Sequence, residues 1–139
     1  MIDLKETFHS VNLKRKTYFD ELLEDTDLNL MEIEILLFLK EYPENNSFTA
    51  IIKSKDYAKS YVSKAITHLV ELEYLKKEAF TDNKKMYQLF LLEKSHQIIE
   101  EYNRCVERFR SCAFAGISDE DAVVFERVMQ KISQNLMER

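Results

Sequence analysis

Residues 58–80 read AKSYVSKAITHLVELEYLKKEAF, and the spacing of the apolar side chains changes partway along this stretch. From Val62 to Val70, apolar side chains recur at steps of three and four residues, which predicts a helix over residues 58–72 with one buried face. We expect the other faces of this helix to be exposed to solvent. The side chains expected there are Lys59, Ser60, Tyr61, Ser63, Lys64 and Thr67.

The period changes from helical to alternating after Tyr74 and Leu75. Residues 76–80 and 86–91 are predicted to form two short strands, which the polar tip at residues 81–85 joins. A β-hairpin is therefore expected directly after the helix.

A shorter helix is predicted just before this stretch. Asn46 and Ser47 offer capping side chains ahead of Phe48, and the helix is expected to end near Lys55. A turn at Asp56–Tyr57 follows. Two helices joined by a short turn are a helix-turn-helix candidate.

Two further helices are predicted on the N-terminal side. Residues 3–25 carry apolar side chains at three- and four-residue steps, which predicts a single amphipathic helix. After a polar break, residues 28–42 are predicted to form a second and largely buried helix, which Pro43 ends.

Two more helices are predicted on the C-terminal side. A long helix is expected over residues 94–114, with Gly116 in its C-terminal cap. Cys105 and Cys112 lie on its inner side, too far apart to form a disulfide with each other. We expect both to act as small buried hydrophobes, and redox sensing is the alternative. The last helix begins after Ser118, which fits an N-terminal capping pattern.

The composition indicates a folded, mainly α protein. The 139 residues are 45% apolar and 32% charged, which suits one domain over residues 1–139. A single glycine and a single proline leave little turn chemistry for an all-β fold. The same scarcity excludes glycine-rich phosphate-binding loops and dinucleotide fingerprints. No apolar run is long enough to cross a membrane and no signal-peptide pattern is present, so we expect a cytoplasmic protein.

No catalytic arrangement of residues is apparent in the sequence. We find no Ser-His-Asp pattern and no pair of carboxylates that stands out from the many charged residues. His9, His68 and His96 fall on different predicted helices and show no metal-ligand spacing. We therefore expect neither an enzyme, nor a metal site, nor a cofactor.

The charge of the chain is unevenly distributed. The net charge of −5 by itself disfavours binding to nucleic acid. Residues 1–52 hold five basic and eleven acidic side chains, whereas residues 53–86 hold eight lysines and five acidic side chains. A basic surface on an acidic chain is typical of a phosphate-binding module, and a solvated lysine-rich surface is the alternative. The eight lysines are Lys53, Lys55, Lys59, Lys64, Lys76, Lys77, Lys84 and Lys85.

The order of predicted elements resembles that of the MarR family of winged-helix transcriptional regulators along nearly the whole chain. Residues 59–75 are similar to the family's recognition helix and its exit into the hairpin, or wing, and residues 116–121 are similar to the entry into its last helix. The resemblance implies a mainly α fold with a small β-hairpin wing. It places a winged helix-turn-helix lobe at residues 28–93 and dimerisation helices at residues 1–25 and 94–139.

The resemblance also implies a function and a set of site residues. It implies a homodimer that binds a pseudo-palindromic operator, with the recognition helix in the major groove and the wing at the minor groove. Repression of transcription is the expected outcome. The implied DNA-binding residues are Lys59, Ser60, Tyr61, Ser63, Lys64, Thr67, Lys84 and Lys85. The alternative is a winged-helix protein-interaction module that has lost DNA binding.

Three positions depart from the family pattern. Lys85 stands where the wing usually carries an arginine, so the wing lacks the planar fork that suits a narrow minor groove. Glu73 stands where a glycine usually follows the recognition helix, so a positive φ there would strain the backbone. Ala58 stands at the usual N-cap, so Asp56 or Ser60 is expected to satisfy the first amides of the helix.

The resemblance further implies a site for a small aromatic effector between the dimerisation helices and the DNA-binding lobe. Aromatic side chains that could line this site occur on several of the predicted helices, and the alternative is that they form ordinary core or dimer contacts. The candidates are Phe8, Tyr18, Phe19, Tyr42 and Tyr102.

Overall fold

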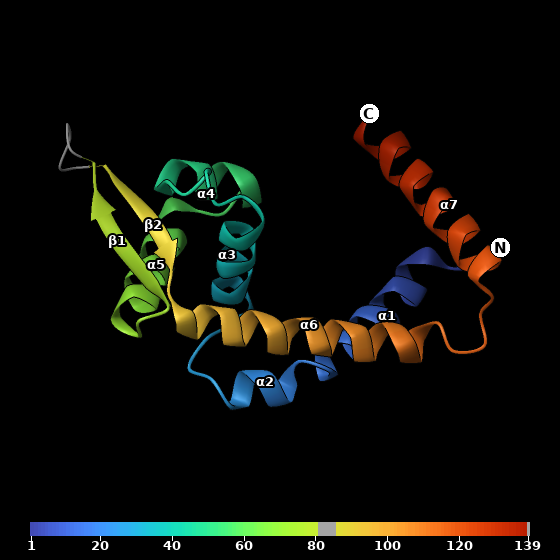
Figure 1. The fold of residues 1–139 in the computed structure, drawn as a ribbon. Coiled ribbons are helices and arrows are strands. Elements are labelled where there is room, and N and C mark those ends of the chain that lie inside the picture. The colour runs from blue at the N-terminus through green and yellow to red at the C-terminus, as the bar shows by residue number, and fades with distance from the viewer. Residues whose placement is uncertain (81–85, 139) are drawn as a thin grey trace. The chain divides into compact units, whose positions relative to one another are not determined.

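The computed structural model describes residues 1–80 and 86–138 and contains seven helices and one antiparallel hairpin in these ranges (Figure 1). The mainly α fold with a small hairpin is confirmed. The chain divides into two compact units, Met1–Cys105 and Val106–Arg139. The elements in chain order are α1 (Leu4–Thr17), α2 (Asp20–Glu24), α3 (Leu30–Glu41), α4 (Phe48–Lys55), α5 (Lys59–Glu71), β1 (Leu75–Ala79), β2 (Tyr87–Leu91), α6 (Glu93–Ala113) and α7 (Asp119–Met137).

The single helix predicted over residues 3–25 is wrong, because the structure contains two helices in this region. The amides of Tyr18 and Phe19 donate to carbonyls three residues back rather than four, which tightens the turn and ends α1. No residue of α1 is buried, whereas Phe19 and Leu22 are buried after the break. The break therefore separates an exposed amphipathic helix from a short helix that contributes to the core.

The core of the first unit lies between α3, α4, α5 and the hairpin. Helix α3 begins in a capping box in which Asn29 and Glu32 each bond the other's backbone amide. Helix α5 packs against α3, α4 and β1. Side chains of these elements, together with Phe19 before α2 and Ser95 on α6, are almost completely shielded from solvent. They are Phe19, Ile33, Ile35, Leu36, Ile51, Val62, Leu69, Leu75, Leu89 and Ser95.

The hairpin pairs β1 with β2 in an antiparallel register that runs from Leu75 opposite Leu91 to Ala79 opposite Tyr87. The buried Asn46 attaches β2 to the segment before α4. Its side-chain Nδ2 donates to the Leu89 carbonyl at 3.0 Å, and its own carbonyl accepts from the Leu89 amide at 2.9 Å. The hairpin is thus anchored to the helix-turn-helix at its inner edge.

Helix α5 ends in a Schellman motif, which fixes the path of the chain into β1. The Tyr74 amide donates to the Leu69 carbonyl, and the Glu73 amide donates to the Val70 carbonyl. Glu73 adopts a φ of +64°, in the left-handed region that this motif requires. This position usually carries glycine, because a side chain raises the energy of the left-handed conformation.

Replacing Glu73 by glycine is therefore expected to stabilise the fold by about 1 kcal/mol, because it relieves the strain of the positive φ. Urea unfolding of the purified variant measures this change. Glu71→Gly is the matched control, since Glu71 is the last helical residue of α5. That substitution is expected to destabilise the fold by about 0.5–1 kcal/mol. A Glu73→Gly variant that is less stable than the wild type would contradict the prediction.

The second unit consists of the end of α6, a turn and α7. Gly116 has a φ of +77°, but it lies three residues beyond Ala113, the last residue of α6, so it shapes the turn to α7 and does not cap the long helix directly. Ser118 caps α7, and its hydroxyl accepts from the Asp121 amide at 3.1 Å as predicted. No residue of α7 is buried.

The two cysteines differ in their surroundings. Cys105 is buried as predicted, but Cys112 is exposed, so the expectation that both are buried is wrong for Cys112. The two residues lie on the same long helix, but Cys105 belongs to the first unit and Cys112 to the second. Among the described residues, no helix is long and apolar enough to cross a membrane.

Candidate nucleic-acid interface

Helix α5 places six of the predicted DNA-binding side chains on its exposed surface. Its buried side consists of Val62, Ala65, Ile66 and Leu69. The opposite side, which we term the recognition face, is solvent-exposed, and the Tyr61 side chain there is 64% exposed. The residues of the recognition face are Lys59, Ser60, Tyr61, Ser63, Lys64 and Thr67.

The recognition face offers hydrogen-bonding groups of two kinds. Lys59 and Lys64 carry ammonium groups that can donate to phosphates or to base edges. The Thr67 hydroxyl donates to the Ser63 carbonyl at 3.0 Å, so it presents lone pairs outward and can accept from a base. The two kinds of group together suit an acceptor-rich major groove and an anionic backbone.

The turn between α4 and α5 orients the recognition face. Ser47 caps α4 by accepting from the Ala50 amide at 3.1 Å. Asp56 then adopts a φ of +54°, which reverses the chain at the end of α4. The predicted capping of α5 by Asp56 or Ser60 is wrong, because among the described residues no side-chain cap forms at its N-cap, Ala58. The first amides of α5 therefore remain available to solvent or to an anion.

Tyr57 attaches this turn to α3, a role that the sequence does not predict. Its hydroxyl donates to the Glu34 carboxylate. Burial raises the pKa of the Tyr57 phenol to about 12, and the hydrogen bond and negative charge of Glu34 add to the increase. The phenol is thus protonated and holds the start of α5 against α3 over the whole neutral range of pH.

This raised pKa predicts a loss of stability at alkaline pH. Between pH 10 and 12 the unfolded chain releases the Tyr57 proton while the folded chain keeps it, so the free energy of unfolding falls as pH rises. Burial also raises the pKa values of Tyr74 and Tyr87, which add to the same trend. Tyr57→Phe is expected to cost about 1 kcal/mol at pH 7 by removing one hydrogen bond. Tyr57→Phe is also expected to reduce the fall in the free energy of unfolding at alkaline pH.

Urea midpoints at pH 8 and pH 11 measure both effects of Tyr57→Phe. Tyr61→Phe is the matched control, because it removes a hydroxyl from a side chain that is 64% exposed. We expect this control to follow the wild-type pH profile. The prediction fails if Tyr57→Phe loses as much stability between the two pH values as the wild type does.

Two lysines of the hairpin already have partners within the chain. Lys76 forms an ion pair with Glu78 at 2.7 Å, and the Lys77 ammonium lies 4.1 Å from the centre of the Tyr87 ring. Both lysine side chains are nevertheless exposed. The predicted DNA-binding residues Lys84 and Lys85 lie outside the described residues.

The predicted effector residues occupy different surroundings. The rings of Phe19 and Tyr102 lie 5.0 Å apart, and Phe19 is buried. Tyr18 is half-buried, and Phe8 is 37% exposed on α1. Tyr42 packs instead on Phe38, with ring centres 5.3 Å apart. The structure therefore brings Phe19 and Tyr102 together, whereas it packs Tyr42 at the end of α3.

A hollow of about 630 Å³ lies between the segment before α3 and the recognition helix, and we term it the α3–α5 hollow. The buried Glu32 carboxylate reaches the His68 ring here, with 2.5 Å between Oε2 and Nδ1. The sequence does not predict this pair. Among the described residues, no group of three His, Cys, Asp or Glu side chains is placed to hold a metal ion. The hollow is lined by Thr26, Asp27, Leu28, Asn29, Met31, Glu32, Tyr61, Lys64, Ala65 and His68.

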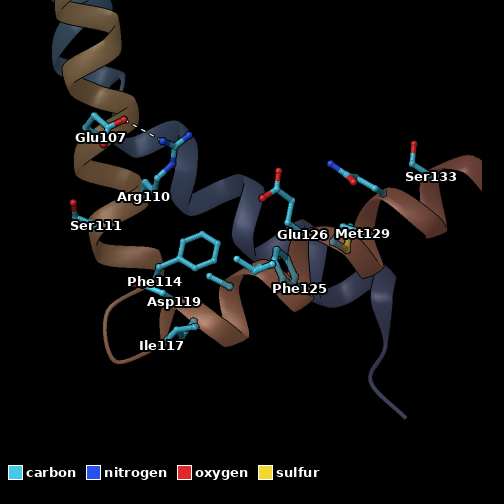
Figure 2. Close-up of a pocket in the computed structure, with 13 residues that line it drawn as sticks. Glu107, Arg110, Ser111, Phe114, Ile117, Asp119, Phe125, Glu126, Met129 and Ser133 are labelled. Carbon is cyan, nitrogen blue, oxygen red and sulfur yellow. Dashed lines mark hydrogen bonds and ion pairs between the residues drawn. The ribbon is translucent and has the colours of Figure 1, made fainter.

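A second hollow, of about 1140 Å³, lies within the second unit (Figure 2). Phe114, just after α6, and Phe125 on α7 both line it and lie edge to face, with ring centres 6.0 Å apart. Arg110 and Glu107, which also line it, form an ion pair of 3.1 Å. The lining of this hollow thus combines apolar and charged side chains.

The structure is similar to solved structures of MarR-type regulators. A crystal structure of MarR has a TM-score of 0.75 at 15% sequence identity, over 99% of this chain and 100% of that chain. An S. aureus MepR–DNA complex has a TM-score of 0.78 at 14% identity, over 98% of this chain and 99% of that one.

A third structure comes from Bordetella bronchiseptica. It is BpsR, whose DNA binding is described as regulated by 6-hydroxynicotinic acid. It has a TM-score of 0.70 at 15% identity, over 94% of this chain and 93% of that chain. No family model matches the sequence, and no curated protein matches it. The similarity is one of fold, and the chain therefore has the winged-helix fold of the MarR-type regulators.

Proposed function

We propose that this protein is a DNA-binding transcriptional regulator that acts in the cytoplasm and reads an operator with the recognition face of α5. The observation that carries the proposal is the recognition face itself, where six polar or aromatic side chains are exposed together on one helix. The core does not use these side chains. The MepR–DNA complex of the same fold supports the same role for this chain.

Salt dependence of binding tests this proposal. If two copies neutralise about three phosphates each, a plot of log affinity for DNA against log salt concentration should have a slope of about −5. Fluorescence anisotropy with a labelled duplex, selected by the protein from random oligonucleotides, measures the slope. Binding that does not respond to salt, or a selection that enriches no sequence, would contradict the proposal.

We further propose that the protein acts as a homodimer on a pseudo-palindromic operator and represses transcription. Helices α1 and α7 support the dimer, because neither has a buried residue although both carry many apolar side chains. A two-fold partner is the natural cover for such faces. Large apolar side chains exposed on these helices are Leu4, Phe8, Val11, Leu13, Val123, Val124, Phe125, Val128, Leu136 and Met137.

A small aromatic effector is proposed to bind near Phe19 and Tyr102. These rings already contact each other with a tilt of 32°, and the Arg15 guanidinium lies 5.6 Å from the centre of the Phe19 ring. A guanidinium beside two aromatic rings suits an aromatic acid, since it can pair with the carboxylate. The regulation of BpsR by 6-hydroxynicotinic acid supports this class of effector. The effector can relieve repression only by binding more tightly to a conformation of the protein that fits the operator less well.

A further inference from the structure

Glu32 and His68 form a pair at the edge of the recognition face. Glu32 is only 4% exposed, and its two carboxylate oxygens have different partners. Oε1 accepts from the Asn29 amide at 2.9 Å, and Oε2 lies 2.5 Å from Nδ1 of His68. The His68 side chain is 40% exposed, so part of the ring faces solvent.

The carboxylate determines which nitrogen of the His68 ring carries hydrogen. An ionised carboxylate only accepts hydrogen bonds, so Nδ1 must donate to Oε2. The second ring nitrogen, Nε2, is then an acceptor in the neutral ring and a donor in the protonated ring. A phosphate oxygen also only accepts, so Nε2 can bind a phosphate only when the ring is protonated.

The His68 ring lies beside a lysine of the recognition face. His68 follows Lys64 by four residues on α5, so the two side chains share one side of the helix. Both line the α3–α5 hollow, as does Tyr61 of the recognition face. The C-terminal part of a recognition helix commonly contacts the DNA backbone, whereas its N-terminal part reads bases.

The charged and titratable groups around His68 come from three segments. Lys64 and Tyr61 belong to α5, Glu32 belongs to α3, and Asp27 belongs to the segment before α3. Glu32 supplies the counter-charge for a protonated ring at hydrogen-bond distance. A bound phosphate would supply a second negative partner on the side of Nε2.

We propose that His68 is a proton-dependent contact to a DNA phosphate, with Glu32 as the positioning residue that holds the ring. The inference rests on the proposed DNA-binding function. A proton from solvent adds to Nε2, and the resulting Nε2–H donates to a phosphate oxygen. The contact needs the added proton, so it strengthens as the pH falls.

The test is the affinity of the full-length protein for the selected duplex between pH 6 and pH 8, at constant ionic strength. We expect the wild type to bind at least about tenfold more tightly at pH 6 than at pH 8, because each copy gains one charge-assisted hydrogen bond at the lower pH. His68→Gln keeps a donor for Glu32 but cannot take up the proton. It is expected to bind at both pH values as the wild type does at pH 8.

Two further variants sharpen the test. His68→Arg carries a permanent charge and is expected to bind tightly at both pH values. His96→Gln is the matched control, because His96 lies on α6 beside Lys40 and away from the recognition face, and its pH profile should match the wild type. Circular dichroism at both pH values shows whether each variant is folded.

The outcomes distinguish this inference from the proposed function. Wild-type protein that binds the duplex with a flat pH profile would overturn the proton-dependent contact alone. A folded His68→Gln variant that keeps the wild-type pH dependence would overturn it too, as would one that is weakened equally at both pH values. If the wild type binds no duplex at any pH, both the proposed function and this inference fail.

Discussion

Lys64→Glu is expected to weaken operator binding by at least about 30-fold, because a specific lysine contact is worth roughly 1–3 kcal/mol and is lost from both copies of the dimer. Lys64 is exposed at the centre of the recognition face. Glutamate at this position removes a donor and also places a negative charge against the DNA backbone. A gel shift or anisotropy titration with the selected duplex measures the loss.

Lys40→Glu is the matched control for Lys64→Glu, since it makes the same change of charge on an exposed residue in the last turn of α3. This control is expected to bind within a few-fold of the wild type. Sedimentation equilibrium shows whether each variant still dimerises. Loss of DNA binding with an intact dimer supports the regulator. Equal binding by both variants would show that Lys64 does not contact the operator. A wild-type protein that dimerises but binds no duplex would instead favour a winged-helix protein-interaction module.

The elements that carry the recognition face could be predicted from local sequence. The periodicity of residues 58–72 predicts which side of α5 is buried, and the structure has Val62 and Leu69 on that side. Ser47 and Ser118 cap their helices because each accepts from an amide three residues ahead. These features depend on neighbours within one helical turn, which is why a sequence pattern is enough to predict them.

Features that depend on two distant segments could not be predicted in this way. His68 and Glu32 are separated by 36 residues, and their contact depends on how α3 packs on α5. Periodicity places Glu32 in a buried helix but names no partner for its carboxylate. The pattern from Asn29 to Glu32 is readable as a capping box, and it could have drawn attention to this end of α3.

The break between α1 and α2 has a similar cause. The spacing of apolar residues continues through residues 3–25, so periodicity alone predicts one helix. The requirement to bury Phe19 and Leu22 in the first unit overrides this spacing. Tertiary packing commonly overrides local propensity in this manner.

Val128→Glu is expected to convert the proposed dimer into a monomer, because a charge without a partner in an apolar interface costs several kcal/mol and occurs in both copies. Val128 is 48% exposed on α7, so the single chain does not need this side chain for its core. The dissociation constant of the dimer should rise by at least about a hundredfold. Sedimentation equilibrium measures it, and circular dichroism should show unchanged helix content.

DNA binding should fall together with dimerisation in Val128→Glu. A monomer binds one half-site only, so it lacks the second recognition helix and the contacts that this helix makes. Gln134→Glu is the matched control, because it adds a charge at an exposed polar position of the same helix and should leave the dimer intact. A Val128→Glu variant that stays dimeric would show that this face of α7 is not the interface. A monomeric variant with wild-type operator affinity would show that one copy suffices for recognition.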